Sequence, residues 1–416
     1  MSIPEKYKVD HLFLLVGTNP LPNYVAAKLL LCDGGTPYFV HSTKTQTYAK
    51  ALCGILGANS KTSMIGLDLN KETNAGEIYS KVKKEVPTSG RVGLHYTGGT
   101  KVMSVHAYRA LRDAVGKERE QPIFSYLDST RLCLQIERGS NEPWSLPLTP
   151  ITPKNDQQRR DLYTQIDLNF DTLWKLHGIT LNPEKSGYTE PRLAKVAEAL
   201  AKAYGGGRRD EWTSFKKSIN EDTIFSAIGS NFADVRMALD EAGYQDAQQL
   251  ANSMFADYKK PGEDECNPVA GAKRWLGSDW LEDHTLDAVR RTGLFTDTHC
   301  AVETKRNDVL PQFEVDVIAL RGYQLFLFSC TTLKTDGECK EKLFEAALRA
   351  RRLGGDEARF ALVCPFWREQ DGQIFTGKKI KDELSELLDS NTFTVFDREA
   401  LKNLPDAILH WAKDLA

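Results

Sequence analysis

Residues 91 to 115, RVGLHYTGGTKVMSVHAYRALRDAV, decide the fold of the N-terminal part of the chain. The short apolar run VGLH is followed by the turn TGGT and then by a segment whose apolar residues recur at helical spacing. Strand, glycine turn and helix in succession form the repeating unit of a parallel sheet, because the helix carries the chain back to the next parallel strand. The turn is therefore expected at the carboxyl end of a strand, where such sheets bind ligands.

The same alternation of strand and helix extends on both sides of this unit. Before it, the pattern predicts strands at 11–17, 37–42 and 63–69 and helices at 23–34, 47–56 and 77–86. After it, the runs 122–128 and 131–137 predict a hairpin that closes the domain near residue 140. We therefore predict a doubly wound α/β sheet, in which Gly34 and Gly35 end the first helix.

Three polar loops follow strands of this sheet and together favour a nucleotide site. They are VGTNPLPN after the first strand, HSTKTQT after the second and HYTGGTKVMS after the fourth. Gly98 and Gly99 allow the backbone to approach a ligand closely, and the amides at the helix start, with Thr97, Thr100 and Lys101, offer a positive cradle for phosphate. The TGGT tetrapeptide alone is better explained as a turn with a capping threonine, and the Walker sequence G-x-x-x-x-G-K-[ST] is absent.

The composition limits the classes of protein that need to be considered. The chain has 416 residues and a formal net charge of −3, which argues against coating nucleic acid by bulk charge but allows a local basic groove. Its longest apolar runs have the length of strands, and we expect neither a signal peptide nor a membrane span. A cytoplasmic location follows. The 8 cysteines form no C-x-x-C pair, so reduced thiols are expected and a zinc site is not.

A polar helical stretch separates the N-terminal sheet from a second α/β segment. Chain breakers occur at YGGGRRDEW and PGEDECNP within this stretch. We predict three domains, namely the sheet domain at 1–145, a linker and helical middle domain at 146–270, and a second α/β domain at 271–416. The elements expected in the last domain are a helix at 273–291, strands at 313–320 and 321–330, a helix at 340–355 and a strand at 359–365.

Two carboxylates, Glu314 and Asp316, leave the same face of the strand EVDVIAL, because successive side chains of a strand alternate. In an otherwise apolar strand such a pair is costly unless it is exposed, paired or bound to metal. For this pair alone, exposure at a sheet edge explains the pattern as well as a metal site does. In the next strand Ser329 and Thr331 share a face, and neither is charged.

The helix that follows carries charged residues on one face. Lys342, Glu345 and Arg349 are spaced at i, i+3 and i+7. Upstream, Glu282 lies near the start of the helix predicted at 273–291. By spacing alone, a solvated helix face with ordinary ion pairs is the commoner explanation for Lys342, Glu345 and Arg349. For Glu282, the alternative is a surface residue near the helix start that the helix dipole stabilises.

The loops of the N-terminal sheet resemble those of the CARF domain, the CRISPR-associated Rossmann-like sensor of cyclic oligoadenylates. The resemblance implies a homodimer that binds a cyclic oligoadenylate across its two-fold axis. Cyclic tetra-adenylate is the leading candidate for this ligand. The residues that carry it, and that it implies as ligand-binding residues, are Gly17, Thr18, Asn19, Ser42, Thr43, Thr97, Gly98, Gly99, Thr100 and Lys101.

The C-terminal pattern WLED, EVDV, LFLFSCTT and KLFE resembles the effector half of CRISPR ancillary nucleases, which join a CARF sensor to a PD-(D/E)xK nuclease domain. The resemblance covers about 10–140 and 275–370 of the chain, and the middle domain carries no matching motif. It implies a restriction-endonuclease-like α/β domain that cleaves DNA, RNA or both with Mn²⁺ or Mg²⁺ in type III CRISPR antiviral defence. Ser329 and Thr331 stand where the family has the Glu and Lys of E-x-K.

On this resemblance, Glu314 and Asp316 bind the metal, and Glu282 adds a further carboxylate or orients water. Lys342 stabilises the developing charge or the nucleophile, and Glu345 binds the metal or orients a ligand of it. Lys334 and Lys340 are the alternatives for the lysine. The other function left open is that of a catalytically degenerate, ligand-controlled regulator that binds nucleic acid.

Overall fold

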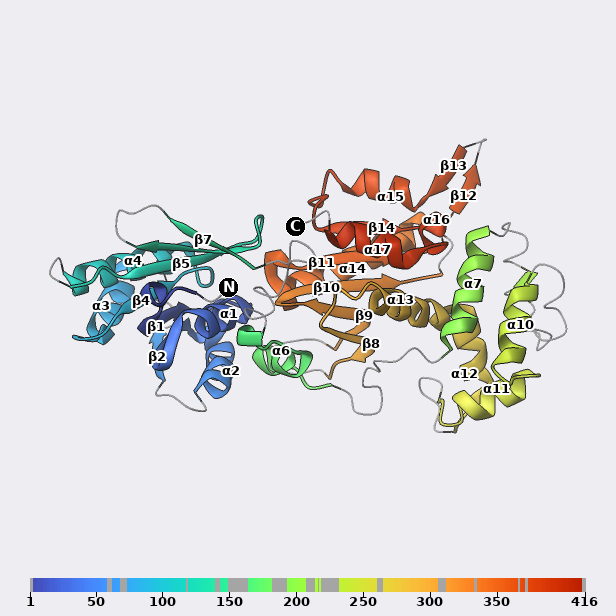
Figure 1. Ribbon diagram of the computed structural model, residues 1–416, viewed down its shortest axis with the longest axis horizontal. Coiled ribbons are helices and arrows are strands. Elements are labelled where there is room, and N and C mark those ends of the chain that lie inside the picture. The colour runs from blue at the N-terminus through green and yellow to red at the C-terminus, as the bar shows by residue number, and fades with distance from the viewer. Residues whose placement is uncertain are drawn as a thin grey trace.

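The structure is a computed structural model that describes residues 3–57, 62–67, 73–116, 119–138, 143–148, 164–181, 193–206, 214–215, 217, 232–259, 265–305, 312–332, 335–365, 367–370 and 373–413. Figure 1 shows the N-terminal sheet at one end of the molecule, the C-terminal sheet in the middle, and helices from the middle of the sequence at the other end. Within the described residues, no helix has both the length and the apolar character needed to cross a bilayer. Each of the eight cysteines is a free thiol.

The N-terminal sheet has seven strands in the order β3-β2-β1-β4-β5-β6-β7. The pairs from β3 to β5 are parallel, and β6 and β7 add antiparallel pairs at one edge. The chain reverses its direction along the sheet between β1 and β4, which is therefore the topological switch point. The strands are β1 (Val9–Leu15), β2 (Leu31–Ser42), β3 (Ser63–Leu67), β4 (Val92–His95), β5 (Ile123–Asp128), β6 (Cys133–Arg138) and β7 (Trp144–Pro147).

Helices cover both faces of this sheet. Side chains of α1 and α2 belong to one apolar core and those of α3 and α4 to another on the opposite face. This arrangement confirms the predicted doubly wound sheet. The helical segments are η1 (Glu5–Tyr7), α1 (Leu21–Leu30), η2 (Thr43–Thr45), α2 (Gln46–Leu56), α3 (Ala75–Glu85) and α4 (Lys101–Val115).

The predicted end of the first helix is wrong. Helix α1 ends at Leu30 and β2 begins at the next residue, Leu31, so Gly34 and Gly35 lie inside β2. The pairing of β1 with β2 shifts register after Val9, and Gly34 has a φ of +74° beside this irregularity. The freedom of glycine at positive φ therefore serves a bulge in a strand instead of a helix end.

The C-terminal sheet has five strands in the order β14-β11-β10-β9-β8. Helix α14 packs on one face with the apolar side chains of β9 and β10 that point toward it, and α13 and α17 pack on the other. The sequence analysis did not predict β8, β14 or the elements between β11 and the C-terminus. The strands are β8 (Asp297–Glu303), β9 (Glu314–Arg321), β10 (Gln324–Cys330), β11 (Arg359–Val363) and β14 (Phe393–Phe396), beside the small hairpin β12 (Trp367–Gln370) and β13 (Gln373–Thr376).

The helices of this domain complete an α/β unit that agrees with the predicted fold class. The segment predicted as one helix at 273–291 is divided by a π-helical turn, η3 (Trp275–Asp279), between α12 and α13. The segments are α13 (Trp280–Arg291), α14 (Asp336–Gly354), η4 (Gly355–Glu357), α15 (Gly377–Leu384), α16 (Arg398–Leu401) and α17 (Leu404–Lys413).

The middle of the chain is helical, as predicted. Helix α7 packs against α13, and its apolar side chains share a core with one face of the C-terminal sheet. The helices are α6 (Phe170–His177), α7 (Ala194–Gly206), α10 (Ala233–Glu241), α11 (Ala247–Met254) and α12 (Pro268–Arg274). The domain boundaries at 145 and 270 stay predictions.

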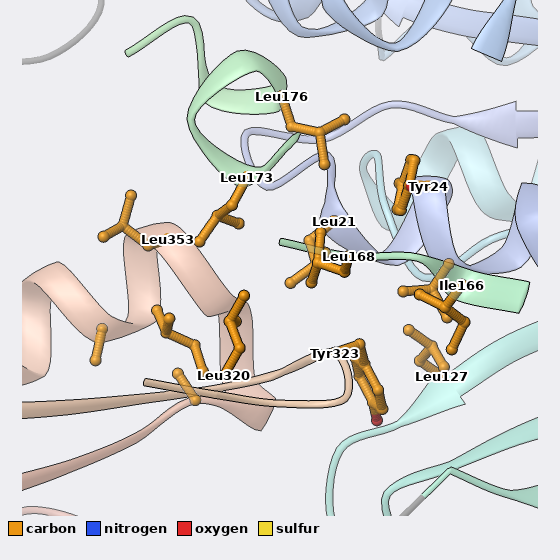
Figure 2. Close-up of a cluster of buried hydrophobic side chains, with 14 of the residues drawn as sticks. Leu21, Tyr24, Leu127, Ile166, Leu168, Leu173, Leu176, Leu320, Tyr323 and Leu353 are labelled. Carbon is orange, nitrogen blue, oxygen red and sulfur yellow. The ribbon is translucent and has the colours of Figure 1, made fainter. Parts of the chain in front are cut away.

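One apolar cluster joins the two sheets. In Figure 2, side chains of α1, β5 and α6 meet those of β9, its hairpin turn and α14, with Tyr323 and Leu353 on the side of the C-terminal domain. The Tyr24 hydroxyl donates a hydrogen bond to the Asp167 carbonyl oxygen at 3.1 Å, and His177 Nε2 lies 2.8 Å from the Leu353 carbonyl oxygen. The two domains therefore share a buried core, through which a change in one can reach the other.

Candidate functional site

The loops that follow β1 and β4 touch at the switch point. A Cβ atom at Gly17 would lie 3.1 Å from the Gly99 backbone nitrogen, and one at Gly98 would overlap the Leu15 carbonyl oxygen. Gly99 has a φ of +76°. The three glycines are therefore required by the contact between the two loops, which places both loops at one edge of the sheet.

This edge presents hydroxyls and the ammonium groups of Lys44 and Lys101 to solvent. Thr100 caps α4, because its Oγ1 accepts a hydrogen bond from the Met103 amide at 3.2 Å. Thr97 joins the loop to β5, because its Oγ1 accepts from the Leu127 amide at 2.7 Å. The N-terminus of a helix of this length attracts anions. The exposed predicted residues at this edge are Thr18, Thr43, Thr97, Gly99, Thr100 and Lys101.

Two of the predicted ligand residues are turned away from solvent. Ser42 is only 5% exposed, and its side chain forms a capping box with Thr45 at the start of η2. Asn19 Oδ1 accepts a hydrogen bond from the Leu21 amide at 3.1 Å, and its Nδ2 lies beside Gly355 of the C-terminal domain. Asn19 therefore connects the loop after β1 to the second domain.

Asp316 is the centre of the second candidate site. Its Oδ2 accepts hydrogen bonds from the Cys330 amide at 2.6 Å and from the Ser329 hydroxyl at 3.1 Å. Burial raises the pKa of Asp316, whereas the Cys330 amide and the charge of Lys342 act in the opposite direction and the charge of Glu314 adds to the rise. A carboxylate with a perturbed pKa that faces a lysine is typical of a functional site.

The charged face of α14 reaches β9, a contact that the spacing of its residues left open. Arg349 donates from Nη1 to the Glu314 carbonyl oxygen at 2.6 Å and from Nη2 to Glu345 Oε2 at 3.3 Å. Lys342 Nζ lies 3.7 Å from the same Glu345 oxygen. The helix thus brings a lysine and a carboxylate to the strand that carries Glu314 and Asp316.

The two alternative lysines differ from Lys342 in position. Lys340 Nζ lies 2.5 Å from Glu383 Oε2 and 3.7 Å from Asp336 Oδ2, so this lysine is held by other carboxylates. Lys334 lies outside the described residues. The charge of Lys342 acts on Asp316 and lowers its pKa, against the effect of burial.

Glu282 approaches the same region from α13. The Cys300 thiol lies 3.9 Å from Glu282 Oε2, and the Cys330 thiol lies 3.4 Å from Thr285 Oγ1, one turn along the same helix. Burial raises the pKa of the Cys330 thiol, and the charges of Asp316 and Glu282 add to the rise. Glu282 and Asp316 therefore share the neutral Cys330 thiol as a neighbour.

Sequence reasoning missed Glu303 because it did not predict β8. Glu303 is paired with Glu314 across the antiparallel ladder, so both side chains leave the same face, and it accepts a hydrogen bond from Gln312 Nε2 at 2.6 Å. Ala301, which by the same register lies opposite Asp316, has a φ of +51°, a strained value for a residue with a Cβ atom. The alternation in CAVET, 300–304, is the signal for this strand.

The oxygen donors of this site have the chemistry that Mg²⁺ and Mn²⁺ prefer. Mg²⁺ keeps several waters and binds proteins through one or two carboxylates, which Asp316 and Glu314 can supply. Within the described part of the chain there is no group of three or more His, Cys, Asp or Glu side chains placed to hold a metal. Ser329 and Thr331 add no charge to the set.

The comparisons with known proteins concern the fold. No protein-family model and no curated protein matches the sequence. The solved structure of VC1899 from Vibrio cholerae is 14% identical, with a TM-score of 0.65 over 98% of this chain and 99% of that one. Can2 from Sulfobacillus thermosulfidooxidans, solved in complex with cyclic tetra-adenylate, is 13% identical, with a TM-score of 0.62 over 97% and 96%. The resemblance read from the sequence is thus confirmed at the level of the fold.

Proposed function

We propose that this chain is a cyclic-oligoadenylate-controlled effector of type III CRISPR antiviral defence. In this proposal it is a cytoplasmic homodimer that cleaves DNA, RNA or both. The observation that carries the proposal is the fold shared over 97% of the chain with Can2, which was solved with cyclic tetra-adenylate. The polar edge at the switch point and the carboxylates of β9 support it from the residues of this chain.

The proposed activator is cyclic tetra-adenylate, bound at the edge formed by the loops after β1, β2 and β4. The amides at the start of α4 and the Lys101 ammonium would neutralise its phosphates, and the exposed hydroxyls of Thr18 and Thr43 would donate to them or to the sugars. A ring with two-fold symmetry suits an isologous interface between two copies of the sheet.

The proposed nuclease site is centred on Asp316, which with Glu314 would hold Mg²⁺ or Mn²⁺. Such an ion supplies a water of lowered pKa and offsets the charge on the scissile phosphate. Lys342 would stabilise that charge from α14, while Glu345 keeps this lysine in place at 3.7 Å. Glu282 would orient water from the α13 side.

A second candidate function is that of a ligand-controlled regulator that binds nucleic acid without cleaving it. The observation that favours it is the contact of Ser329 with Asp316. The Ser329 hydroxyl donates a hydrogen bond to Asp316 Oδ2 at 3.1 Å, at a position where the nuclease family has a carboxylate. The Ser329 hydroxyl therefore uses an oxygen of the Asp316 carboxylate as its acceptor, whereas a carboxylate at this position would add oxygen atoms that can bind metal.

Cleavage by the purified protein separates the two candidates. Protein is incubated with Mn²⁺ and either plasmid DNA or single-stranded RNA, with and without cyclic tetra-adenylate, and the products are resolved on gels. We expect ligand-dependent cleavage that falls at least about 100-fold in Asp316→Asn, which keeps the shape of the side chain. Equal cleavage by both proteins would show that the site has been assigned wrongly.

The double variant Ser329→Glu with Thr331→Lys tests the second candidate function, because it restores the E-x-K pattern. If the wild-type protein binds cyclic tetra-adenylate and is inactive while the double variant cleaves on adding the ligand, the regulator is the correct function. Binding of the ligand is measured separately by calorimetry, so that loss of sensing and loss of cleavage are distinguished.

A further inference from the structure

A cavity of about 720 Å³ lies between the N-terminal and C-terminal domains, and none of the residues predicted for the two sites above lines it. Ser129 and Thr130, in the turn between β5 and β6, form one wall. Helix α14, η4, β11 and the segment after α15 form the remaining walls. The volume lies within the range of pockets that bind small molecules.

Exposed apolar side chains gather at this cavity. Phe344, Leu348 and Leu387 are 38%, 73% and 73% exposed, and all three line it. In the described part of the chain, the other large apolar side chains with comparable exposure are dispersed over different elements, namely Met64, Val105 and Met237. Contiguous exposed apolar surface of this kind marks a binding site.

Arg359 places a positive charge at the wall of the cavity. The residue is 4% exposed, and its Nη1 donates to the carbonyl oxygens of Glu357 and Ala358 at 3.1 and 3.2 Å. Its Nε is buried and has no hydrogen-bond partner among the described residues. Asp389 is the carboxylate whose charge acts most strongly on Arg359. The Asp389 Oδ1 atom accepts a hydrogen bond from the Asn391 amide. A buried guanidinium without a carboxylate in contact favours an anion as its partner.

The cavity and the Asp316 site use different faces of α14. Phe344, Leu348 and Arg351 are three to four residues apart and line the cavity. At about 100° per residue, this face lies roughly opposite the one that carries Lys342 and Arg349. The cavity is therefore separate from the site that faces β9.

We propose that this cavity binds a small molecule with an aromatic or aliphatic body and one anionic group. The body packs on Phe344, Leu348 and Leu387, and the anion meets Arg359. Because Ser129 and Thr130 come from the N-terminal domain and the other lining residues from the C-terminal domain, the bound molecule holds the two domains together. This inference goes beyond the proposed function and does not depend on it.

The first test compares two dyes that share an apolar body and differ in charge. Anilinonaphthalene sulfonate carries an anion, and N-phenyl-1-naphthylamine is neutral. Titration of each into the full-length protein, followed by fluorescence, is expected to give an affinity for the anionic dye about tenfold higher, because a charge-assisted hydrogen bond is added. Equal affinities would overturn the role of Arg359.

Variants assign the dye to the cavity. Leu348→Glu changes an exposed side chain and is expected to reduce binding of both dyes at least about tenfold, whereas Arg359→Gln reduces only the anionic one. Met237→Glu, which alters a residue with 59% exposure on α10, is the matched control and leaves binding unchanged. If Leu348→Glu binds both dyes like the wild-type protein, the cavity is not the site. Should Arg359→Gln fail to fold, Leu387→Glu replaces it, with loss of both dyes expected and unchanged binding contradicting the proposal.

Competition identifies the source of the natural ligand. Adenosine monophosphate and decanoate both combine an apolar body with an anion, one as a nucleotide and the other as a fatty acid. Displacement of the anionic dye by adenosine monophosphate, with adenosine inactive, assigns a nucleotide. Displacement by decanoate assigns a lipid acid. If neither displaces it, the cavity accepts an adventitious additive only and the proposal fails.

Discussion

The buried carboxylate of Asp316 is expected to lower the stability of the fold. Its pKa is raised by burial, so that keeping it ionised at neutral pH costs free energy, and the residue opposite it, Ala301, has a strained backbone. Two hydrogen bonds, from Ser329 and from Cys330, limit this cost. Stability and function are therefore expected to respond in different directions to substitution here.

Asp316→Asn and Asp316→Ala separate the two contributions. Asparagine keeps an oxygen that accepts both hydrogen bonds and carries no buried charge, so we expect a thermal midpoint equal to or above that of the wild-type protein. Alanine leaves both donors without their acceptor and is expected to lower the free energy of unfolding by about 1–3 kcal/mol. Thermal melts followed by circular dichroism test the pair, and an equal loss in both variants would contradict the account.

Glu357 predicts a pH dependence of stability. Burial raises its pKa to about 7, and the charges of Asp356 and Asp128 add to the rise. Because the pKa in the folded state lies above the unfolded value of about 4.3, the folded state binds the extra proton between about pH 4.3 and 7. The free energy of unfolding therefore falls as the pH rises through this window, by up to about 4 kcal/mol.

Glu357→Gln mimics the protonated side chain and is expected to remove this fall. In urea unfolding, the variant is expected to be more stable than the wild-type protein at pH 8 and to match it at about pH 4.5. Glu341→Gln, an exposed change on α14, is the control and leaves the difference between the two pH values as in the wild-type protein. A Glu357→Gln advantage that is the same at both pH values would rule out titration of this residue.

At the scale of elements, α14 is a predicted helix that begins at Asp336, four residues before the predicted start at 340. One face holds the apolar core, and another carries Lys342, Glu345 and Arg349 to β9. We expect Lys342→Gln to reduce metal-dependent cleavage by about 10- to 100-fold, because its charge acts on Asp316. Lys340→Gln, on the same helix but bound to Glu383, is the matched control and keeps the activity. Equal losses in the two variants would assign the effect to the helix and not to Lys342.

The elements that could be predicted are those in which one local pattern dominates. The apolar alternation of β9 and β10 and the spacing of α4 and α14 are local, and these elements formed where expected. A pair of glycines such as Gly34 and Gly35 suits both the end of a helix and a bulge in a strand. Only the pairing of β2 with β1 shows that the glycines belong to a strand. The cavity was beyond prediction because its walls come from residues far apart in the chain.

At the scale of the whole molecule, α14 runs between the two candidate sites. In its C-terminal half, its charged face contacts β9 through Arg349 and the Glu314 carbonyl oxygen. The same end of the helix is followed by Gly355, beside which Asn19 of the loop after β1 is packed. A ligand that moves this loop would therefore displace the C-terminal end of α14, the helix that also carries Lys342.

Gly355→Ala tests this connection. A Cβ atom at Gly355 would lie 2.5 Å from Asn19 Nδ2 and 2.9 Å from Glu357 Oε2, and the backbone there has a φ of +75°. We expect the free energy of unfolding to fall by about 1–3 kcal/mol from the backbone strain alone. We also expect activation by cyclic tetra-adenylate to weaken while binding of the ligand is retained, because the added methyl group displaces Asn19 from the helix end.

Gly116→Ala is the control that isolates the contact from the strain. Gly116 follows α4 as Gly355 follows α14, with φ and ψ of 70° and −175° against 75° and −158°, and no atom lies within 4 Å of its added Cβ. Both variants carry similar backbone strain, so a larger loss of stability in Gly355→Ala measures the clash with its neighbours. Asn19→Gly in the Gly355→Ala background removes the nearer of them and is expected to recover that excess. If the two glycine variants lose the same stability and keep the same response to the ligand, Asn19 and Gly355 do not connect the domains.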